Sequence, residues 1–318
     1  MGKILVTGAC GQLGSELTAK LSSIYGSENL IVTDIRNCPN NSGFQYFEIL
    51  DVLDKNKLAE ISGKYQIDQI YHLAAILSAK GEQNPVQAWD INMMGLLNIL
   101  DFAREINVKK LFWPSSIAVF GPTTPRVSTP QFTVAEPNTV YGISKLAGER
   151  WCEYYFNKYN LDIRSLRYPG LISYKTPPGG GTTDYAVEIF FEAIQRGSYQ
   201  SFLGNNTRLP MMYMEDAIRG SVELMESDAK NISVRSSYNF AAMSFTPEEI
   251  AREIKKHIPD FSITYSPDFR QKIADSWPES IDDEIARSDW GWKEKFSLSE
   301  MTSDILRNLE PIIQKSFL

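Results

Sequence analysis

Tyr141 and Lys145 stand four residues apart, in what the sequence predicts to be the first turns of a helix. Residues at this spacing share one helix face, so the lysine ammonium can stabilise a phenolate and lower the tyrosine pKa from its ordinary value of about 10. A decrease of about 2.5 units requires roughly 3.4 kcal/mol, more than one ammonium supplies in a partly wet site. A second positive charge, such as an oxidised nicotinamide ring, would help. The pair therefore indicates a proton-abstracting tyrosine beside a redox cofactor.

Tyr154 and Lys158 repeat the same spacing further along the predicted helix. Tyr141 and Tyr154 are thirteen residues apart, which places them about 220° apart around a helix of 3.6 residues per turn. At most one of the two pairs can face a common site, and the spacing alone does not say which. The surroundings of Tyr141 have to decide.

The N-terminal segment favours the first pair. Residues 3–7 form a short apolar run that predicts a buried strand, and three glycines at intervals of three follow it before a helical pattern begins. Such a turn lets backbone N–H groups approach a pyrophosphate, whose charge the helix N-terminus favours. A plain glycine-rich turn is the alternative. The cofactor-binding residues predicted here are Gly8, Gly11, Gln12, Leu13 and Gly14.

The next apolar run, residues 30–33, ends in Asp34, twenty residues after Gly14. An acid at this place holds the ribose hydroxyls of NAD and repels a 2′-phosphate, so the sequence favours NAD over NADP. Arg36 opposes this prediction, because a nearby arginine can accept the phosphate of NADP. It could equally stack on the adenine, and both alternatives stay open.

The composition excludes several classes of partner. The chain has 318 residues, a net charge of -7 and a pI near 5.1, which argues against nucleic acid or an anionic membrane surface as the partner. No apolar stretch approaches the length that spans a bilayer. The first strand begins at residue 3, which leaves no room for a signal or transit peptide. We expect a cytoplasmic protein, with a matured organellar protein as the open alternative.

Cysteine and histidine are sparse. The three cysteines, Cys10, Cys38 and Cys152, are odd in number and widely spaced, so the sequence predicts neither a disulfide framework nor a zinc knuckle. His72 and His257 are the only histidines, which argues against a zinc-dependent dehydrogenase. We therefore predict no metal site.

Apolar strand-like runs alternate with helical patterns through the first half of the chain. Strands are predicted at 69–73, 110–114 and 162–167, with a helix at about 85–106 and the Tyr141 helix between them. This alternation is typical of the α/β class and predicts a doubly wound parallel sheet, the Rossmann fold, with ligands at the carboxyl ends of its strands.

Beyond a loop at 177–183 the pattern becomes mixed. We predict a smaller, mixed C-terminal lobe for substrate, built from about 171–207 and 241–318. Residues 1–170 and about 208–240 would form the NAD-binding Rossmann domain.

Chemistry-bearing residues also follow two other predicted strands. His72 is followed by Leu73, Ala74 and Ala75, whose small size would let a nicotinamide ribose or the pyrophosphate approach the backbone; tight packing is the alternative. Ser115 and Ser116 follow the next strand. A serine hydroxyl beside the tyrosine can hydrogen-bond a substrate oxygen as it develops charge, whereas without Tyr141 a solvated turn serine would be the simpler interpretation.

The glycine pattern, the His72 segment, Ser116, and Tyr141 with Lys145 together resemble the extended short-chain dehydrogenase/reductase family over the first half of the chain. Further segments along nearly the whole length resemble the L-threonine 3-dehydrogenases of that family. These segments are 76–82, 167–173, 179–185, 209–214, and 269–271 with 275–278.

The resemblance implies oxidation of the threonine Cβ hydroxyl to a ketone, giving 2-amino-3-oxobutyrate and NADH in threonine catabolism. It makes Tyr141 the base, Lys145 the residue that holds the nicotinamide ribose and tunes the tyrosine, and Ser116 the residue that orients the hydroxyl, with Ser115 assisting. Ser78, Thr182 and Thr183 would hold the substrate's polar end, and Trp277 would cover the site. We complete the NAD site with Asp51, Val52, Leu73, Ala74, Ala75, Asn92 and Tyr168.

Two residue positions depart from the pattern of the extended family, and they bear on the alternative functions. Phe120 stands where many extended relatives have tyrosine, and Pro169-Gly170 replaces an asparagine-containing segment of the nucleotide-sugar members. An NAD-dependent nucleotide-sugar epimerase or dehydratase would need phosphate-binding arginines in the second lobe, and Arg270 and Arg287 leave it open. A non-catalytic NAD-sensing regulator is disfavoured, because it has no need of the serine, tyrosine and lysine together.

The predicted helices near 85–106 and after Tyr141 carry more apolar residues than one face against a sheet requires. We therefore predict a homodimer with a four-helix interface, with burial under the second lobe as the alternative. The residues concerned are Met94, Leu97, Trp151, Tyr155 and Phe156.

Overall fold

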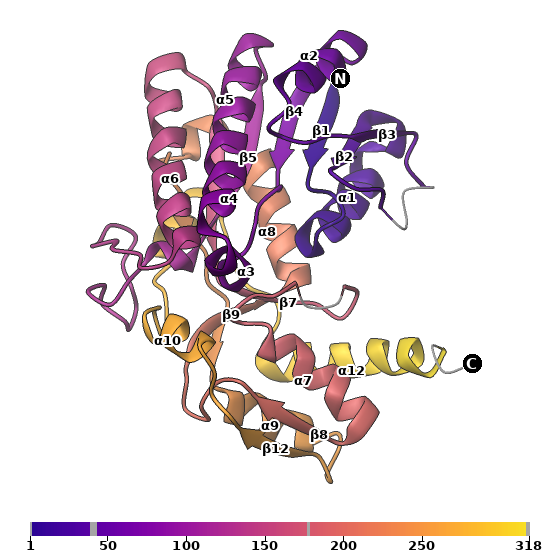
Figure 1. Ribbon diagram of the computed structural model, residues 1–318, viewed down its shortest axis with the longest axis vertical. Helices are drawn as coiled ribbons and strands as arrows, with labels where there is room; N and C mark the ends of the chain where they lie inside the picture. The colour runs from indigo at the N-terminus through magenta and orange to yellow at the C-terminus, as the bar shows by residue number, and fades with distance from the viewer. Residues whose placement is uncertain (1, 39–42, 177–178, 316–318) are drawn as a thin grey trace.

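The computed structural model describes residues 2–38, 43–176 and 179–315. Figure 1 shows a large upper lobe, in which helices flank a sheet, and a smaller lower lobe of short strands and helices beneath the sheet's lower edge. The N-terminus lies in the upper lobe, and the chain ends with a helix of the lower lobe.

The upper lobe is built on a seven-stranded sheet of order β10-β6-β5-β4-β1-β2-β3, in which every neighbouring pair is parallel. The sheet therefore confirms the predicted doubly wound fold. Chain order reverses between β1 and β4, and ligands of such sheets bind at that point, beyond the carboxyl ends of the strands. The strands are β1 (Lys3–Thr7), β2 (Leu30–Asp34), β3 (Tyr46–Ile49), β4 (Ile67–His72), β5 (Lys110–Ser116), β6 (Ile163–Tyr168) and β10 (Tyr238–Asn239).

Each face of this sheet is covered by an apolar core. Ile4 and Val6 of β1 belong to the core with α1 (Gln12–Tyr25) and α8 (Met214–Glu226). Leu5, between them, belongs to the core with α2 (Lys55–Lys64) and α5 (Gly95–Glu105). Successive side chains of a strand point to opposite faces, so a short, wholly apolar run is what a strand covered on both sides requires.

The helix predicted at 85–106 is observed in three continuous parts. These are α4 (Pro85–Trp89), a π-helical turn (Asp90–Met94) and α5. The Asn84 side chain accepts the Gln87 N–H and Pro85 occupies the first turn, which explains the start of the helix. The π-helical turn places Asn92 toward the ends of the central strands, as discussed below.

The long helix α6 (Val140–Tyr159) carries both tyrosine and lysine pairs. The Thr139 hydroxyl accepts the Gly142 N–H at 3.0 Å and caps the helix, and Asn160 ends it in the left-handed conformation. A Cβ on Gly142 would overlap the carbonyl oxygen of Ala118. The glycine therefore lets the first turn of α6 closely approach the 3-10 turn Ile117–Val119 that follows β5.

The lower lobe contains a three-stranded sheet of order β11-β9-β7 and a parallel pair of β8 and β12. The chain returns to the upper lobe through α8 and β10 before it re-enters the lower one. The predicted division of the chain into lobes stays a proposal, and α11 contacts β10 of the large sheet. The elements are α3 (Ser78–Gln83), β7 (Gly170–Ile172), α7 (Tyr185–Arg196), β8 (Ser198–Ser201), β9 (Leu209–Tyr213), β11 (Met243–Phe245), α9 (Pro247–Lys255), β12 (Ser262–Tyr265), α10 (Arg270–Asp275), α11 (Glu284–Trp290) and α12 (Leu298–Lys315). Short 3-10 turns occupy Ser27–Asn29, Ile117–Val119 and Ala229–Asn231.

Candidate active site

A cavity of about 230 Å³ lies where the central strands of the large sheet end, and both lobes line it. Most of the residues predicted from the sequence meet here. Those that line the cavity are Gly8, Gly11, Gln12, Leu13, Gly14, Leu73, Ala75, Ser78, Ser115, Ser116, Tyr141, Lys145, Tyr168, Thr182, Thr183 and Trp277. Segments far apart in the sequence therefore converge on one site.

The glycine turn forms one wall of this cavity. Gly8 has a φ of 71°, in the region that favours glycine, and a Cβ there would lie 2.5 Å from the backbone nitrogen of Ala74. A Cβ on Gly14 would overlap the carbonyl oxygen of Gly8. The N-terminus of α1 is thus held tightly against the strand ends, with the buried Gln12 Nε2 lacking a protein partner among the described residues. This cradle and its unused donor fit a dinucleotide pyrophosphate.

Asp34 is the last residue of β2 and is only 8% exposed. One carboxylate oxygen accepts the Cys10 N–H at 2.9 Å and the other accepts the Arg36 N–H at 3.3 Å. The Arg36 side chain is 71% exposed, and its Nε lies 4.0 Å from the carboxylate. The carboxylate therefore lies beside the glycine turn, and its contact with a ribose stays a prediction.

Asp51, Val52 and Asn92 lie outside the lining of the cavity, and their contact with a cofactor stays a prediction. Asp51 accepts the Leu53 N–H at 2.9 Å, and Val52 is buried. The Asn92 amide accepts the Ile76 N–H at 2.8 Å and donates to the Ile76 carbonyl at 3.0 Å. Asn92 therefore fixes the segment that follows β4.

Tyr141, Ser116 and Lys145 lie together on one side of the cavity. Burial raises the pKa of Tyr141 to about 12, while a hydrogen bond with the Ser116 hydroxyl acts in the opposite direction. Lys145 Nζ is 5.5 Å from the centre of the Tyr141 ring and donates to the Pro114 carbonyl oxygen at 2.7 Å. Burial lowers the Lys145 pKa to about 7.

The expectation that Lys145 lowers the tyrosine pKa is wrong for the protein alone. Burial is the largest cause of both pKa shifts, and it disfavours both the phenolate and the ammonium. The lysine also bonds to a backbone oxygen instead of the phenol. A further positive charge in the cavity would act to lower the Tyr141 pKa.

Ser115 does not share the position of Ser116. Its hydroxyl is buried and donates to a Glu149 oxygen at 2.6 Å. The geometry therefore gives no support to the predicted assisting role, because the hydroxyl is already used by a buried carboxylate.

Glu149 was not predicted from the sequence. It is completely buried and receives two hydrogen bonds from Arg167, each of 2.8 Å. Arg167 also donates to the Gln131 carbonyl and to the Asn239 side chain. The available signal was the position of Glu149, four residues after Lys145 on the same helix face, where a charge needs a buried partner.

The substrate side of the cavity comes from two distant segments. The hydroxyl oxygens of Ser78, at the start of α3, and Thr182 are 3.2 Å apart, and both side chains are buried. Thr183 and Trp277, which is 4% exposed, complete this wall. The site thus gathers hydroxyl groups under an indole ring.

Asp184 also lines the cavity and was missed. Its carboxylate accepts the Gly180 and Gly181 N–H groups at 2.8 and 2.7 Å, and burial raises its pKa. It holds the loop that carries Thr182; an aspartate after a glycine run is a known turn signal. Pro177 and Pro178, at the start of the predicted loop, lie outside the described residues.

The model of the NAD dependent epimerase/dehydratase family matches residues 4–240. The chain belongs to this family. A Staphylococcus aureus (strain USA300) protein described as an uncharacterized epimerase/dehydratase is 48% identical over 98% of this chain and 97% of its own length. The match confirms the resemblance to extended short-chain dehydrogenases that the sequence motifs indicated.

Within this epimerase/dehydratase family, the chain is similar to solved structures of threonine dehydrogenases. The holo form of a GalE-like L-threonine dehydrogenase from Cupriavidus necator is 54% identical, with a TM-score of 0.95 over 96% of this chain and 99% of that chain. A monomeric L-threonine 3-dehydrogenase from a metagenome, in the apo form, is 49% identical, with a TM-score of 0.94 over 97% and 99% of the two chains. The likeness includes the smaller lobe, where relatives with different substrates would be expected to diverge.

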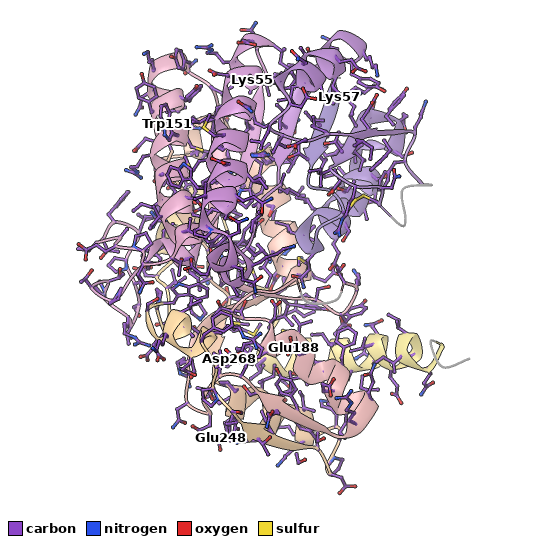
Figure 2. The ribbon with its side chains drawn as sticks, viewed as in Figure 1. Lys55, Lys57, Trp151, Glu188, Glu248 and Asp268 are labelled. Carbon is purple, nitrogen blue, oxygen red and sulfur yellow. A yellow bond between two sulfur atoms is a disulfide. The ribbon has the colours of Figure 1, made fainter. Side chains whose placement is uncertain are left out.

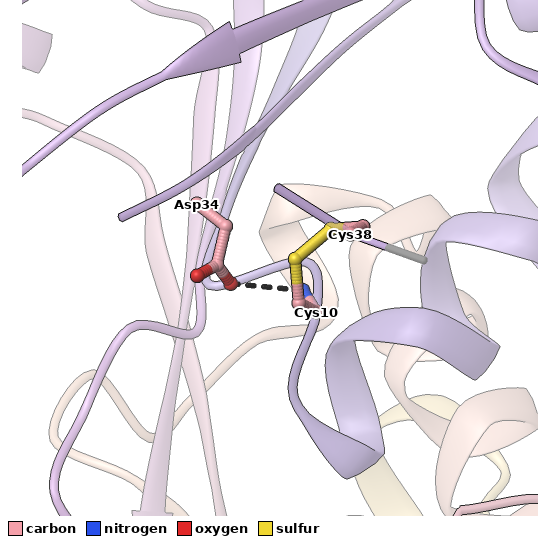
Figure 3. A group of neighbouring side chains, drawn as sticks. All are labelled: Cys10, Asp34 and Cys38. Carbon is pink, nitrogen blue, oxygen red and sulfur yellow. Dashed lines mark hydrogen bonds between the residues drawn. A yellow bond between two sulfur atoms is a disulfide. The ribbon is translucent and has the colours of Figure 1, made fainter. Parts of the chain in front are cut away.

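The structure corrects the prediction for the cysteines of this family member. Cys10 and Cys38 form a disulfide with a Cα–Cα distance of 5.3 Å (Figure 3), and Cys152 is free and buried. The prediction was wrong because 28 residues separate the pair in sequence, while the neighbouring parallel strands β1 and β2 end side by side. Among the described residues, Cys10, Asp34 and Cys38 are also the group whose ligand atoms lie close enough to hold a metal, but both sulfurs are used by the disulfide.

None of the helices among the described residues has the length and apolar character needed to cross a membrane.

Proposed function

We propose that this chain is an NAD-dependent L-threonine 3-dehydrogenase, which oxidises the Cβ hydroxyl of L-threonine to give 2-amino-3-oxobutyrate and NADH. The observation that carries the proposal is the 54% identity, over both lobes, to a structure described as an L-threonine dehydrogenase. The Ser116, Tyr141 and Lys145 cluster in the shared cavity supplies the groups that this reaction needs.

NAD supplies the hydride acceptor when bound, and its oxidised ring adds a positive charge to the cavity. The glycine turn and the start of α1 would hold the pyrophosphate, with Gln12 as an additional donor. Asp34 would accept the ribose hydroxyls, which favours NAD over NADP.

Tyr141 would take the proton of the threonine hydroxyl. Its pKa of about 12 in the protein alone has to fall, and a charged Lys145 together with the oxidised cofactor works in that direction. Ser116 would hold the hydroxyl oxygen during the transfer. Removal of the proton lets electrons flow from the oxygen toward the Cβ as its hydride leaves.

The cavity favours a small substrate. The hydroxyls of Ser78 and Thr182, 3.2 Å apart in the wall of the cavity, suit the polar end of an amino acid. Arg270 already pairs with Asp268, and Arg287 pairs with two acids. Among the described residues, no arginine lines the cavity, and this disfavours a nucleotide-sugar epimerase, which needs such groups to bind phosphate.

We also propose a homodimer formed through α4, α5 and α6. Met94, in the π-helical turn between α4 and α5, is 44% exposed, and Trp151 of α6 is 39% exposed (Figure 2 labels Trp151), although Tyr155 proves to be buried at 6%. One similar structure is described as monomeric, so the assembly requires its own test. Light scattering at micromolar concentration should give twice the mass of 36.0 kDa, and a mass of one chain would contradict the dimer.

Together with the threonine dehydrogenase activity, we propose a cytoplasmic location and a part in threonine catabolism.

The test is NADH formation by the purified chain from NAD and L-threonine. Parallel reactions contain L-allo-threonine, L-serine or a nucleotide-diphosphate sugar, and the series is repeated with NADP. We expect reduction of NAD by L-threonine. Reaction with the nucleotide sugar alone would establish the epimerase alternative, and bound NAD without any turnover would favour a regulator.

A further inference from the structure

The disulfide joins two segments that flank the ribose-binding acid. Cys10 lies inside the glycine turn, and Cys38 lies four residues after Asp34. Figure 3 shows the bond beside the Asp34 carboxylate, which accepts the Cys10 N–H at 2.9 Å. The covalent bond and the proposed cofactor contact therefore share one residue of the turn.

The segment after β2 has few other anchors. Ile35, Arg36 and Asn37 are all exposed. Apart from the disulfide, the Arg36 N–H bond to Asp34 is 3.3 Å long, and the Arg36 guanidinium donates to the Cys10 carbonyl at 3.4 Å. Both contacts are long and the second is exposed, so each contributes little. The sulfur bond is the strongest link between this segment and the glycine turn.

The two sulfurs are also reachable without passing through the catalytic cavity. Cys10 and Cys38 line a second cavity of about 940 Å³, together with Ala9, Ser15 and Phe44. This cavity and the catalytic one have no lining residue in common. A small thiol can therefore enter the second cavity without displacing a substrate.

We propose that Cys10 and Cys38 form a thiol–disulfide site that sets the affinity of the chain for NAD. The closed bond holds the Asp34 carboxylate and the following segment in the arrangement that receives the adenosine ribose. Reduction frees the segment, which then has to be ordered when the cofactor binds. This inference rests on one part of the proposed function, the binding of NAD, and does not depend on which substrate is oxidised.

The chemistry is a thiol–disulfide exchange. A dithiol reductant gives two electrons and two protons to the two sulfurs, through a mixed disulfide, and ends as a cyclic disulfide itself. A low-molecular-weight disulfide reverses the reaction and leaves as two thiols. In a reducing compartment such bonds are commonly transient or redox-sensing, which suits a cytoplasmic enzyme whose cofactor is itself a redox carrier.

The test measures the binding of ADP-ribose by calorimetry to the oxidised and the dithiol-reduced protein. ADP-ribose carries the adenosine and the pyrophosphate but not the nicotinamide ring, so its binding needs no turnover. Ordering one additional backbone residue weakens binding about tenfold, and we expect a loss of this size on reduction. Equal affinity in both states would overturn the inference.

Two variants assign the effect to this pair. Cys38→Ser should bind ADP-ribose as weakly as the reduced wild type, whether or not reductant is present. Cys152→Ala, which keeps the pair and removes the remaining cysteine, should respond to reductant like the wild type. A response in Cys38→Ser, or none in Cys152→Ala, would contradict the assignment. Turnover with L-threonine is measured separately, so a failure of the proposed substrate leaves this result intact.

Discussion

Helix α6 carries the same tyrosine and lysine spacing twice, in two different environments. Lys158 Nζ donates directly to the Tyr154 hydroxyl at 2.7 Å on the exposed surface. Lys145 is buried, lies 5.5 Å from the centre of the Tyr141 ring and bonds to a backbone oxygen instead. The pair with the shorter contact is therefore the one outside the cavity. Direct contact on the surface identifies no site, whereas burial beside a cofactor cradle does.

The pKa values of the two lysines shift in opposite directions. The pKa of Lys158 is raised, mainly by its hydrogen bond to Tyr154, while burial lowers the pKa of Lys145 to about 7. At neutral pH the surface lysine is a fixed charge, and the buried lysine stands near its titration midpoint. A group of the second kind is the one whose charge a bound cofactor or substrate can change.

The largest expected difference between the pairs is in turnover. Tyr141→Phe should lower kcat by about 10² to 10⁴, as for loss of a general base, and leave NAD binding intact. Tyr154→Phe removes the same hydroxyl from the surface pair and should retain the wild-type rate. Steady-state kinetics with L-threonine measure both, and similar rates for the two variants would remove the distinction between the pairs.

The second difference is between a buried and an exposed ion pair of α6. Glu149→Gln breaks the buried ion pair with Arg167 and should lower the free energy of unfolding by about 3 to 5 kcal/mol, because it leaves the arginine unpaired. Glu153→Gln breaks the exposed pair with Arg150 and should change it by about 0 to 1 kcal/mol. Urea unfolding of the cofactor-free variants compares them. Equal losses would show that the buried pair does not stabilise this face.

Adjacent serines give a third comparison. Ser116→Ala removes the hydroxyl next to Tyr141 and should lower kcat/KM by about 10². Ser115→Ala should mainly lower stability, by about 1 to 3 kcal/mol, because Glu149 loses a buried donor. Rates and urea midpoints are measured for each variant. A larger kinetic loss in Ser115→Ala would restore the assisting role that the sequence suggested.

The smallest expected effect is a pH dependence of stability. The folded-state pKa of Lys145, about 7, lies below its unfolded value, so folding is penalised below pH 7 and the penalty is relieved as pH rises toward 10.5. The wild type should therefore gain stability relative to Lys145→Met, by at most about 1.4 kcal/mol per pH unit. Against Lys158→Met the difference in stability should stay constant over this pH range, because the raised pKa of Lys158 lies above 10.5 and its stabilisation is lost only as the pH rises past that value. Unfolding from pH 7 to 9.5 tests this, and an equal rise in both comparisons would contradict the assigned environments.

Local patterns predicted the central strands and α6 well, because a strand buried on both faces leaves an unbroken apolar run. The edge strand β3 was missed, since its side chains are partly exposed and it lacks such a run. The π-helical turn inside 85–105 was also missed, because it depends on how Asn92 meets the segment after β4.

Within the candidate site, residues on strand ends and helix starts were predictable and long-range partners were not. Spacing placed Tyr141 with Lys145, but only the packed structure shows Glu149 meeting Arg167 or Cys10 meeting Cys38. The tyrosine pKa was predicted in the wrong direction for the protein alone, because the sequence shows the neighbouring charge and not the burial that opposes it.

The central claim is that the Cβ–H of L-threonine is transferred to NAD while the Tyr141 pair removes the hydroxyl proton. The most direct measurement uses L-threonine deuterated at Cβ, with mass spectrometry of the reduced cofactor. We expect that the NADH formed carries one deuterium and that Tyr141→Phe forms it far more slowly. Unlabelled NADH, or none at all with the cofactor bound, would contradict the account.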